Sequence, residues 1–401
     1  MTRRVAITGV GVTSAFGRGV DALATGLREG RHALGPLSAF PLTSLGPALT
    51  AELREPVDEP PGFEDDRKSA LALEAARAAL LDADLQAPLA AGVWLGTGLS
   101  SCTPRELEED AFPYLAGSGF DEAAVIGDIA RDRVAPRRHL PERATEAVVA
   151  LGLEGPAATS FSACAAGAQA LGLAARAVRR GDVQVALGGA HDAMIHPLGV
   201  LSFAALGALS EDRCRPFDRR RDGFTIGEGS AVLVLEDEDH ARARGARVLG
   251  WLLGCGTSVD AWNLTAPHPE GRGAALSMRR ALRDAGLGPE AVSHVNAHGT
   301  GTPLGDAAEA RAVLDVLGPQ VPVASIKGAI GHCIAAAGAV EAAAIVAGLS
   351  QGWSAGTAGL EEDDALGITL QRSPREDRPS VVLSNSFGFG GQNCTLLFGA
   401  P

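Results

Sequence analysis

Short apolar runs rich in β-branched residues alternate along the chain with longer Ala-rich segments whose polar residues recur at helical spacing. The short runs predict buried strands, and the long segments predict helices that pack on a sheet. Such alternation is typical of parallel sheets flanked by helices. In the first half we expect strands at 5–11, 92–98, 183–190 and 231–235, and helices at 68–81, 163–180 and 238–245.

The same alternation starts again after residue 245. Here we expect strands at 247–258, 292–299 and 321–327, and helices at 273–285, 306–317 and 335–349. The segment 380–399 predicts two antiparallel strands around a Gly-rich turn. We therefore expect two α/β halves, residues 1–245 and 246–401, in one compact body, because no Ser/Pro-rich linker separates them.

The composition is that of a globular protein, since 46% of the 401 residues are apolar and 21% are charged. The longest apolar run, 335–349, is broken by glycines and by Glu341, so we expect no membrane span. The N-terminal stretch has no signal-peptide pattern, which predicts a cytoplasmic protein. The net charge of −13 disfavours a nucleic-acid-binding surface.

Cys164 stands where a β-forming run ends and an Ala/Gly-rich helix begins. A thiol at a helix N-terminus lies near free backbone N–H groups and the positive end of the helix dipole, and both favour the thiolate. Residues 165–168 are small and would let a thioester approach closely. A small cysteine packed in the core would have the same local pattern, so this segment alone leaves both interpretations open.

Two histidines follow predicted strands in glycine-containing loops. His298 lies in NAHGTGTPLGD beside Thr300 and Thr302, and His332 lies in SIKGAIGHC, five residues after Lys327. Each histidine alone could be a structural hydrogen-bonding residue. Together with a cysteine at a helix start, they match thiolate chemistry with two imidazoles around one carbonyl.

Metal and nucleotide sites are not indicated. His294 and His298 are four residues apart, but on a strand this places them about 13 Å apart, too far to share a metal ion. The six cysteines show no repeated short spacing, which predicts reduced thiols without a metal site. The segment GVGVTSAFG lacks the third glycine of a dinucleotide fingerprint.

The motifs SACAAG, RPFDRRRDGFTIGEG, NAHGTGTPLGD, SIKGAIGHCIAAAGAVE and NSFGFGGQN resemble, in order and spacing, those of the β-ketoacyl synthases of the thiolase superfamily. The likeness spans nearly the whole chain and is strongest to the free-standing elongating enzymes of bacterial fatty-acid and type II polyketide pathways. It implies a thiolase-like fold, in which two similar α/β halves form a layered α-β-α-β-α body. It also implies decarboxylative Claisen condensation of a malonyl group, carried by an acyl carrier protein, with an acyl chain on an enzyme cysteine. The implied enzyme needs no cofactor besides the phosphopantetheine of the carrier.

The resemblance implies roles for individual residues. Cys164 would accept the acyl chain, while His298 and His332 would bind the malonyl thioester carbonyl and promote decarboxylation. Lys327 would orient the two histidines through Glu309.

Further residues would shape the substrate path. Phe387 would be the gate of the site, and its N–H would form the oxyanion hole together with that of Cys164. Phe389 would contact substrate or anchor the terminal hairpin. Thr300 and Thr302 would hold the phosphopantetheine arm.

Two segments depart from the fatty-acid enzymes. Segment 135–151 is about one helical turn shorter and carries charged residues, and segment 201–210 lacks a basic residue that often meets the carrier protein. The candidates for carrier docking are therefore Arg67, Lys68 and the cluster Arg131, Arg133, Arg137, Arg138 and Arg143. That cluster could equally be a solvated face. These departures favour a specialised, polyene-type polyketide pathway over housekeeping lipid synthesis.

Two other functions compete with this one. A non-catalytic chain-length-factor-like partner would typically lack the cysteine, which is present here. A degradative thiolase acting on coenzyme A would use a second cysteine near the C-terminus as a base, and Cys394 is the candidate. For the condensing enzyme we expect either a homodimer or a heterodimer with a chain-length-factor-like subunit. Its interface would be built from the first-half sheet edge and residues 95–160.

Overall fold

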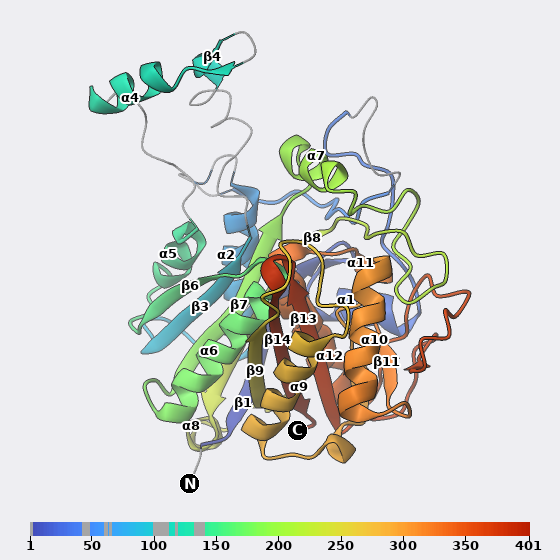
Figure 1. The fold of residues 1–401 in the computed structure, drawn as a ribbon. Coiled ribbons are helices and arrows are strands. Elements are labelled where there is room, and N and C mark those ends of the chain that lie inside the picture. The colour runs from blue at the N-terminus through green and yellow to red at the C-terminus, as the bar shows by residue number, and fades with distance from the viewer. Residues whose placement is uncertain are drawn as a thin grey trace.

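The fold is that of a computed structural model, which describes residues 3–41, 49–59, 63, 66–98, 112–116, 119–131 and 141–401. Within this part of the chain one mixed sheet runs through the molecule, in the strand order β12-β11-β10-β13-β14-β9-β1-β8-β7-β3-β6. Figure 1 shows it with helices on both faces.

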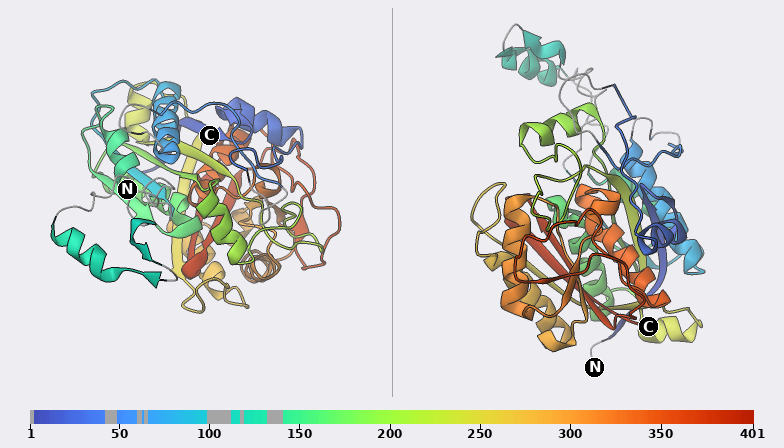
Figure 2. Two further views of the ribbon diagram at one scale, coloured as in Figure 1. Left: turned by 90° about the horizontal axis from the view of Figure 1, so that it is seen from above. Right: turned by 90° about the vertical axis from the view of Figure 1, so that its right-hand side faces the viewer.

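The first half of the chain forms one side of this sheet. Its strands are β1 (Val5–Ser14), β2 (Gly17–Arg18), β3 (Ala91–Thr97), β6 (Ala157–Phe161), β7 (Val185–Ala193) and β8 (Glu228–Asp237). Its helices are α1 (Val20–Arg28), α2 (Arg67–Asp82), α5 (Arg143–Val149), α6 (Ala166–Arg180), α7 (Pro197–Ala205) and α8 (Glu238–Ala243), and the 3-10 turn η3 (Ala163–Ala165) precedes α6. A small hairpin of β4 (Leu115–Ala116) and β5 (Gly119–Phe120) leads into α4 (Glu122–Ala130), which stands apart from the main body (Figure 2).

The second half forms the other side. Its strands are β9 (Gly250–Val259), β10 (His294–Asn296), β11 (Pro322–Ala324), β12 (Thr369–Leu370), β13 (Val381–Gly388) and β14 (Gln392–Gly399). Its helices are α9 (Arg272–Ala285), α10 (Pro303–Leu317), α11 (Lys327–Ile330) and α12 (Ala337–Gln351), with the 3-10 turns η5 (Ile334–Ala336) before α12 and η6 (Phe389–Gly391) between β13 and β14. The halves join where β1 pairs with β9.

The expectation of parallel strands holds only for the outer strands. β3 is parallel to β6 and β7, and β10 is parallel to β11 and β13, whereas β1, β8, β9 and β14 are antiparallel to their neighbours. Buried strands of either direction give continuous apolar runs. The hydrophobic pattern therefore located the central strands but did not distinguish their direction.

Helices lie in three layers, one between and two outside the parts of the sheet that the two halves of the chain form. α6 and α12 pack against each other and against strands of both sides, α2 and α5 cover the first side, and α9 and α10 cover the second (Figures 1 and 2). Glycines let the two central helices touch near their N-termini. A Cβ on Gly167 would lie 2.9 Å from the carbonyl oxygen of Ala335, and one on Gly338 would lie 3.0 Å from the amide nitrogen of Ala168. This contact fixes the helix ends that carry the candidate site.

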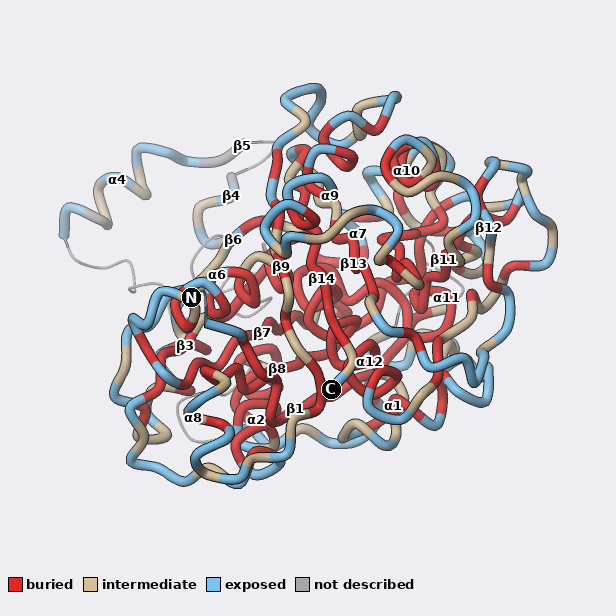
Figure 3. The backbone as a smooth tube through the Cα atoms, turned by 90° about the horizontal axis from the view of Figure 1, so that it is seen from below, coloured by how far each residue is buried: buried red, intermediate tan, exposed pale blue. Residues whose placement is uncertain are grey.

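The most buried segment is the central helix α12, whose residues from Ala337 to Leu349 are all buried (Figure 3). Together with η5 it forms an 18-residue span, Ile334–Gln351, that is long and apolar enough to cross a membrane, with a mean hydropathy of 1.5. This is longer than the sequence analysis expected. However, 89% of the span is buried inside the protein, as expected of a core helix.

Candidate active site

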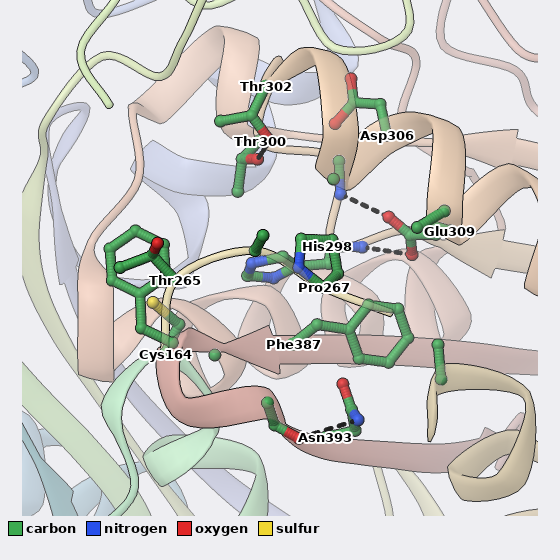
Figure 4. A pocket seen from close by; sticks show the side chains of 18 of the residues that line it. Cys164, Thr265, Pro267, His298, Thr300, Thr302, Asp306, Glu309, Phe387 and Asn393 are labelled. Carbon is green, nitrogen blue, oxygen red and sulfur yellow. Dashed lines mark hydrogen bonds between the residues drawn. The ribbon is translucent and has the colours of Figure 1, made fainter. Parts of the chain in front are cut away.

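Turns that follow β6, β10 and β11 bring Cys164, His298 and His332 together. The thiol sulfur and one nitrogen of each imidazole lie within 4.8 Å of one another, and all three residues are buried. Figure 4 shows Cys164 and His298 facing the same pocket. The three residues come from both halves of the chain, so the site exists only where the halves meet.

Cys164 lies in the tight turn η3, directly before α6. The residue before it, Ala163, has a positive φ of 46°, a backbone conformation that costs energy for a side chain with a Cβ. Ile334, the first residue of the matching turn η5 before α12, has a φ of 47°. Both halves therefore use the same strained entry into a central helix, and in the first half it presents the thiol to the pocket.

His332 is the direct partner of the thiol. Its Nε2 lies 3.1 Å from the Cys164 Sγ, and its ring meets Phe224 edge-on at a centroid distance of 5.2 Å. Burial lowers the pKa of His332 well below its usual value, and the charge of Lys327 lowers it further. A neutral imidazole in contact with a thiol can accept the proton of that thiol.

Burial controls the ionisation of the thiol. It raises the pKa of Cys164 to about 12, opposed by the charge of Lys327 and by the backbone N–H groups of Phe389 and Cys164. The backbone N–H groups favour the thiolate, as the sequence analysis expected, but they do not set the ionisation of Cys164. Desolvation in the closed pocket outweighs the N–H groups, so the thiol needs a base.

His298 is held by its backbone. Glu309 accepts hydrogen bonds from the N–H groups of His298 and Gly299, at 2.8 and 2.7 Å, and from the side-chain amide of Asn385 at 3.0 Å. The His298 ring meets the His332 ring edge-on at 5.3 Å. Burial also lowers the pKa of His298 well below its usual value. Both imidazoles are thus neutral in the resting site.

The direct ion-pair partner of Lys327 is Glu341, whereas its charge acts on Glu309 only at a distance. Its ammonium forms an ion pair with Glu341 of α12, and both side chains are only 1% exposed. Glu309 instead fixes the loop that carries His298. Glu341 was missed in the sequence analysis, although it is the one charged residue in the apolar run 335–349 and that isolation could have marked it as a buried partner.

Glu341→Gln is expected to destabilise the fold by about 3 to 5 kcal/mol, because the Lys327 charge would stay buried without a counter-ion. The shift of the urea unfolding midpoint measures this effect. As a matched control, Glu376→Gln breaks the exposed ion pair with Arg28 and should change the midpoint far less. Equal midpoints for the parent and Glu341→Gln would show that the pair contributes nothing to stability.

The backbone N–H groups beside the thiol belong to Cys164 and Phe389, whereas the sequence analysis assigned the oxyanion hole to Cys164 and Phe387. The N–H groups of Phe389 and Cys164 favour the charged sulfur, and a Cβ on Gly388 would lie 3.1 Å from the Cys164 amide nitrogen. Phe389 lies in η6 and packs in the same apolar cluster as Cys164. Phe387 lies within β13, packs against the core of the second half and has its ring centroid 5.9 Å from that of His298.

A pocket leads outward from these residues. It encloses about 810 Å³, including its open mouth, and Thr300 and Thr302 line it before α10. Their hydroxyl oxygens lie 3.0 Å apart (Figure 4). Two hydroxyl groups on the wall of this pocket suit a ligand arm with amide groups.

A loop at the pocket mouth is tied to the turn that carries Phe389. The N–H of Asp260 donates to the carbonyl of Gly391, and the N–H of Gly390 donates to the carbonyl of Leu264. The side chain of Asn393 donates to Asp260 at 2.8 Å. The sequence analysis missed these residues, because their contacts join segments about 130 positions apart.

The three site residues could also hold a metal ion on geometric grounds, and in the described part of the chain they form the one such group of His, Cys, Asp and Glu. The nearby Lys327 charge, which lowers the pKa of both imidazoles, opposes a bound cation. The donor set therefore fits proton transfer better than metal binding.

Among the described residues, the arginines and the lysine that were candidates for carrier docking are mostly ion-paired or buried. Arg67 is paired with Glu228, and Lys68 is 7% exposed. Arg143 forms an ion pair with Asp66, while Arg131 is exposed. Arg133, Arg137 and Arg138 lie outside the described residues. Docking through Arg67 and Lys68 is therefore not supported.

Cys394, the candidate base of a thiolase, lies in β14 and does not line the pocket. Its thiol neighbours Cys255, with the sulfur atoms 3.9 Å apart. The thiolase alternative therefore has no second cysteine in the described site.

Comparisons with known proteins match this geometry. Residues 2–241 match the family model of the N-terminal domain of β-ketoacyl synthase, and residues 249–361 match that of the C-terminal domain. The 3-oxoacyl-[acyl-carrier-protein] synthase 2 of Synechocystis sp. is 35% identical over 424 residues, covering 99% of this chain and 98% of that protein. The same enzyme of Coxiella burnetii is also 35% identical, covering 98% of each chain.

Solved structures of similar proteins cover the whole chain. The ishigamide ketosynthase/chain length factor has a TM-score of 0.88 at 30% identity, and a β-ketoacyl synthase from Burkholderia phymatum STM815 has a TM-score of 0.87 at 31% identity. A type II polyketide ketosynthase solved with its acyl carrier protein, AntDE:AntF, has a TM-score of 0.88 at 26% identity. Each match covers 100% of both chains.

Proposed function

The chain belongs to the β-ketoacyl synthase family, and from this premise we propose which residues carry out each step of the condensation. The enzyme joins an acyl chain bound to a cysteine with a malonyl group carried by an acyl carrier protein, in type II polyketide or fatty-acid biosynthesis. The observation that carries the assignment of roles is the contact between the thiol of Cys164 and the neutral imidazole of His332.

Acyl transfer begins at this contact. His332 takes the proton of the Cys164 thiol, and the sulfur attacks the carbonyl of the incoming thioester. The N–H groups of Cys164 and Phe389 stabilise the negative oxygen that develops. The proton then leaves with the thiol of the phosphopantetheine arm, which Thr300 and Thr302 hold in the passage.

Decarboxylation follows on the loaded enzyme. Acylated Cys164 has no proton to donate, so the His332 ring can carry its own proton on Nε2 in place of Nδ1 and turn that N–H toward the malonyl carbonyl beside His298. Loss of CO₂ gives an enolate, which two neutral imidazoles can stabilise by N–H donation in a dry pocket. The enolate carbon attacks the acyl carbonyl and releases Cys164.

Condensation with carrier-bound substrates tests this function. We expect the protein to gain the mass of one acyl group from acyl carrier protein, and to form a β-ketoacyl product when malonyl carrier protein is added. Acyl-coenzyme A alone should load the enzyme less well. A protein that degrades β-ketoacyl-coenzyme A but does not use the carrier would favour the thiolase alternative.

The presence of Cys164, His298, His332 and Lys327 in one site favours the catalytic subunit over a chain-length-factor-like partner. The polyketide ketosynthase relatives support a specialised polyketide pathway over lipid synthesis. Products formed with a panel of carrier proteins would separate the two pathways.

Phe389→Ala is expected to uncouple the half-reactions, because we propose that this ring, and not that of Phe387, closes the unloaded site. Its turn contacts the thiol through the Phe389 N–H and contains glycines that permit movement. Release of CO₂ from malonyl carrier protein without prior acyl loading measures the effect. In the matched control, Phe387→Ala should keep the order of the reactions and cost about 1 to 3 kcal/mol of stability. Premature CO₂ release in the control alone would show that Phe387 is the gate.

We also propose that the enzyme works as a dimer joined at β6. This strand is one of the two outer strands of the described sheet, and its Phe161 is 48% exposed. Exposed edge strands pair readily with a second chain. Light scattering at micromolar concentration should give twice the mass of the chain. A dimer that forms only after a homologous second subunit is added would indicate the heterodimer, and a fully active monomer would contradict the proposal.

A further inference from the structure

Two cysteines outside the pocket lie side by side in the second half of the sheet. Cys255 of β9 and Cys394 of β14 have their sulfur atoms 3.9 Å apart. The strands are adjacent and antiparallel, with Leu396 opposite Cys255 and Thr257 opposite Cys394, so the two cysteines are diagonal neighbours. The condensation mechanism uses neither of them.

The two thiols differ in access. Cys255 is partly exposed, whereas Cys164, Cys214, Cys333 and Cys394 are buried. Cys255 lies beside the ion pair of Arg179 and Asp284, and its backbone N–H donates to that Asp284 carboxylate. Cys255 is therefore the less buried residue of the pair.

The two thiols also differ in ionisation. The hydrogen bond from Cys394 lowers the pKa of Cys255, and Arg176 and Arg179 lower it further. The same contact raises the pKa of Cys394 well above its usual value. Cys255 is thus the more nucleophilic thiol, and Cys394 remains protonated beside it.

We propose that Cys255 and Cys394 form an oxidation site, at which a hydroperoxide converts the two thiols into a reversible disulfide. The Cys255 sulfur attacks the peroxide, the O–O bond breaks, and a sulfenic acid forms with release of hydroxide or alkoxide. The Cys394 sulfur then attacks the sulfenic sulfur, the S–S bond forms, and the S–O bond breaks. The departing oxygen takes the Cys394 proton and leaves as water.

The bond requires a shift of the strands. The sulfur atoms must approach from 3.9 Å to about 2.05 Å. Diagonal positions of paired strands lie about 7 to 8 Å apart, beyond the usual Cα separation of a disulfide, so the backbone must move to close the bond. The disulfide is therefore strained, and strained disulfides are easily reduced and suited to reversible control.

A shift of β14 would reach the catalytic loop. Thr395, next to Cys394, donates from its hydroxyl to the side chain of Asn385 at 2.9 Å. Asn385 donates to Glu309, which holds the backbone of His298. We expect oxidation to slow decarboxylation through this chain of contacts. This consequence rests on the proposed function, whereas the disulfide itself does not.

The experiment treats the reduced full-length protein with hydrogen peroxide and maps its peptides without reduction. We expect one peptide pair linking Cys255 to Cys394, a mass lower by two hydrogen atoms, and reversal by dithiothreitol. Cys255→Ser should abolish the link, and Cys214→Ser should keep it. Sulfinic acid at Cys255 without a link, or no change at either thiol, would overturn the proposal.

The catalytic consequence is measured on the same samples. Oxidised protein should lose CO₂ release from malonyl carrier protein and recover it with dithiothreitol, while Cys255→Ser stays active after peroxide. A linked protein with full activity would overturn the coupling and leave the oxidation site intact. An enzyme without activity before oxidation would instead contradict the proposed function.

Discussion

Cys164→Ala is expected to abolish acyl loading and to reduce condensation by roughly 10³-fold or more, because no other described thiol faces the two imidazoles. Cys255 and Cys394 lie on strands outside the pocket, and Cys214 donates its thiol hydrogen to the carbonyl of Thr300. Alanine fits the space of cysteine, so the free energy of unfolding should change by only about 1 kcal/mol.

Intact mass after incubation with acyl carrier protein measures the loading, and peptide mapping locates the acyl group. Cys255→Ser is the matched control and should still load, since its side chain lies outside the pocket. Acyl label on Cys333 in the parent protein would defeat the assignment of Cys164. Cys102, a further candidate for stray label, lies outside the described residues.

The sequence predicted which residues would meet, because the residues at the ends of strands form one edge of a sheet. Cys164, His298 and His332 each follow a predicted strand in a glycine-containing segment, and the family motifs around them fixed their order. Those motifs also predicted the layered fold, which the family matches confirm. Strand ends, helix starts and turn residues depend on local patterns, and they could therefore be predicted from the sequence.

The ion-pair partners of charged side chains could not be predicted in the same way. Lys327 pairs with Glu341 across the contact between α11 and α12, and no local pattern sets the distance between those side chains. The sequence analysis chose Glu309 because it lies near His298 in sequence. In the fold, both oxygens of Glu309 are used by the backbone of the His298 loop.

The ionisation of Cys164 also depends on the complete fold. A helix N-terminus favours a thiolate by a modest, local effect, whereas desolvation depends on every element that closes the pocket. Here burial dominates and raises the pKa of the thiol to about 12. Burial also lowers the pKa of both imidazoles and keeps them neutral, and the Lys327 charge adds to that effect while it opposes the rise in the pKa of the thiol. The buried ammonium of Lys327 thus lowers the pKa of the nucleophile and that of its base.

His332→Ala is expected to impair both half-reactions. The sequence analysis placed His332 in the malonyl step alone, but its Nε2 lies 3.1 Å from the Cys164 sulfur, and we propose that it accepts the proton of that thiol. Without this base the protein must rely on the thiolate that exists at equilibrium. That fraction is roughly 10⁻⁵ at pH 7 for a pKa of about 12.

His298→Ala provides the matched comparison, because it removes an imidazole from the malonyl site and leaves the contact between His332 and the thiol in place. It should lose CO₂ release from malonyl carrier protein but keep acyl loading of Cys164. His332→Ala should lose CO₂ release and also load slowly. Intact mass over time and release of labelled CO₂ separate the two variants.

The pH dependence of Cys164 alkylation by iodoacetamide tests the role of His332 as a base. A thiol whose pKa lies far above the experimental range gains thiolate about tenfold for each unit of rising pH. In His332→Ala, the alkylation rate at Cys164 should therefore rise about tenfold per pH unit between about pH 7 and 9, starting from a rate well below that of the parent. His298→Ala should keep the rate and the pH profile of the parent. If His332→Ala alkylated as fast as the parent at pH 7, the thiol would lose its proton by another route, and His332 would act in the malonyl step only.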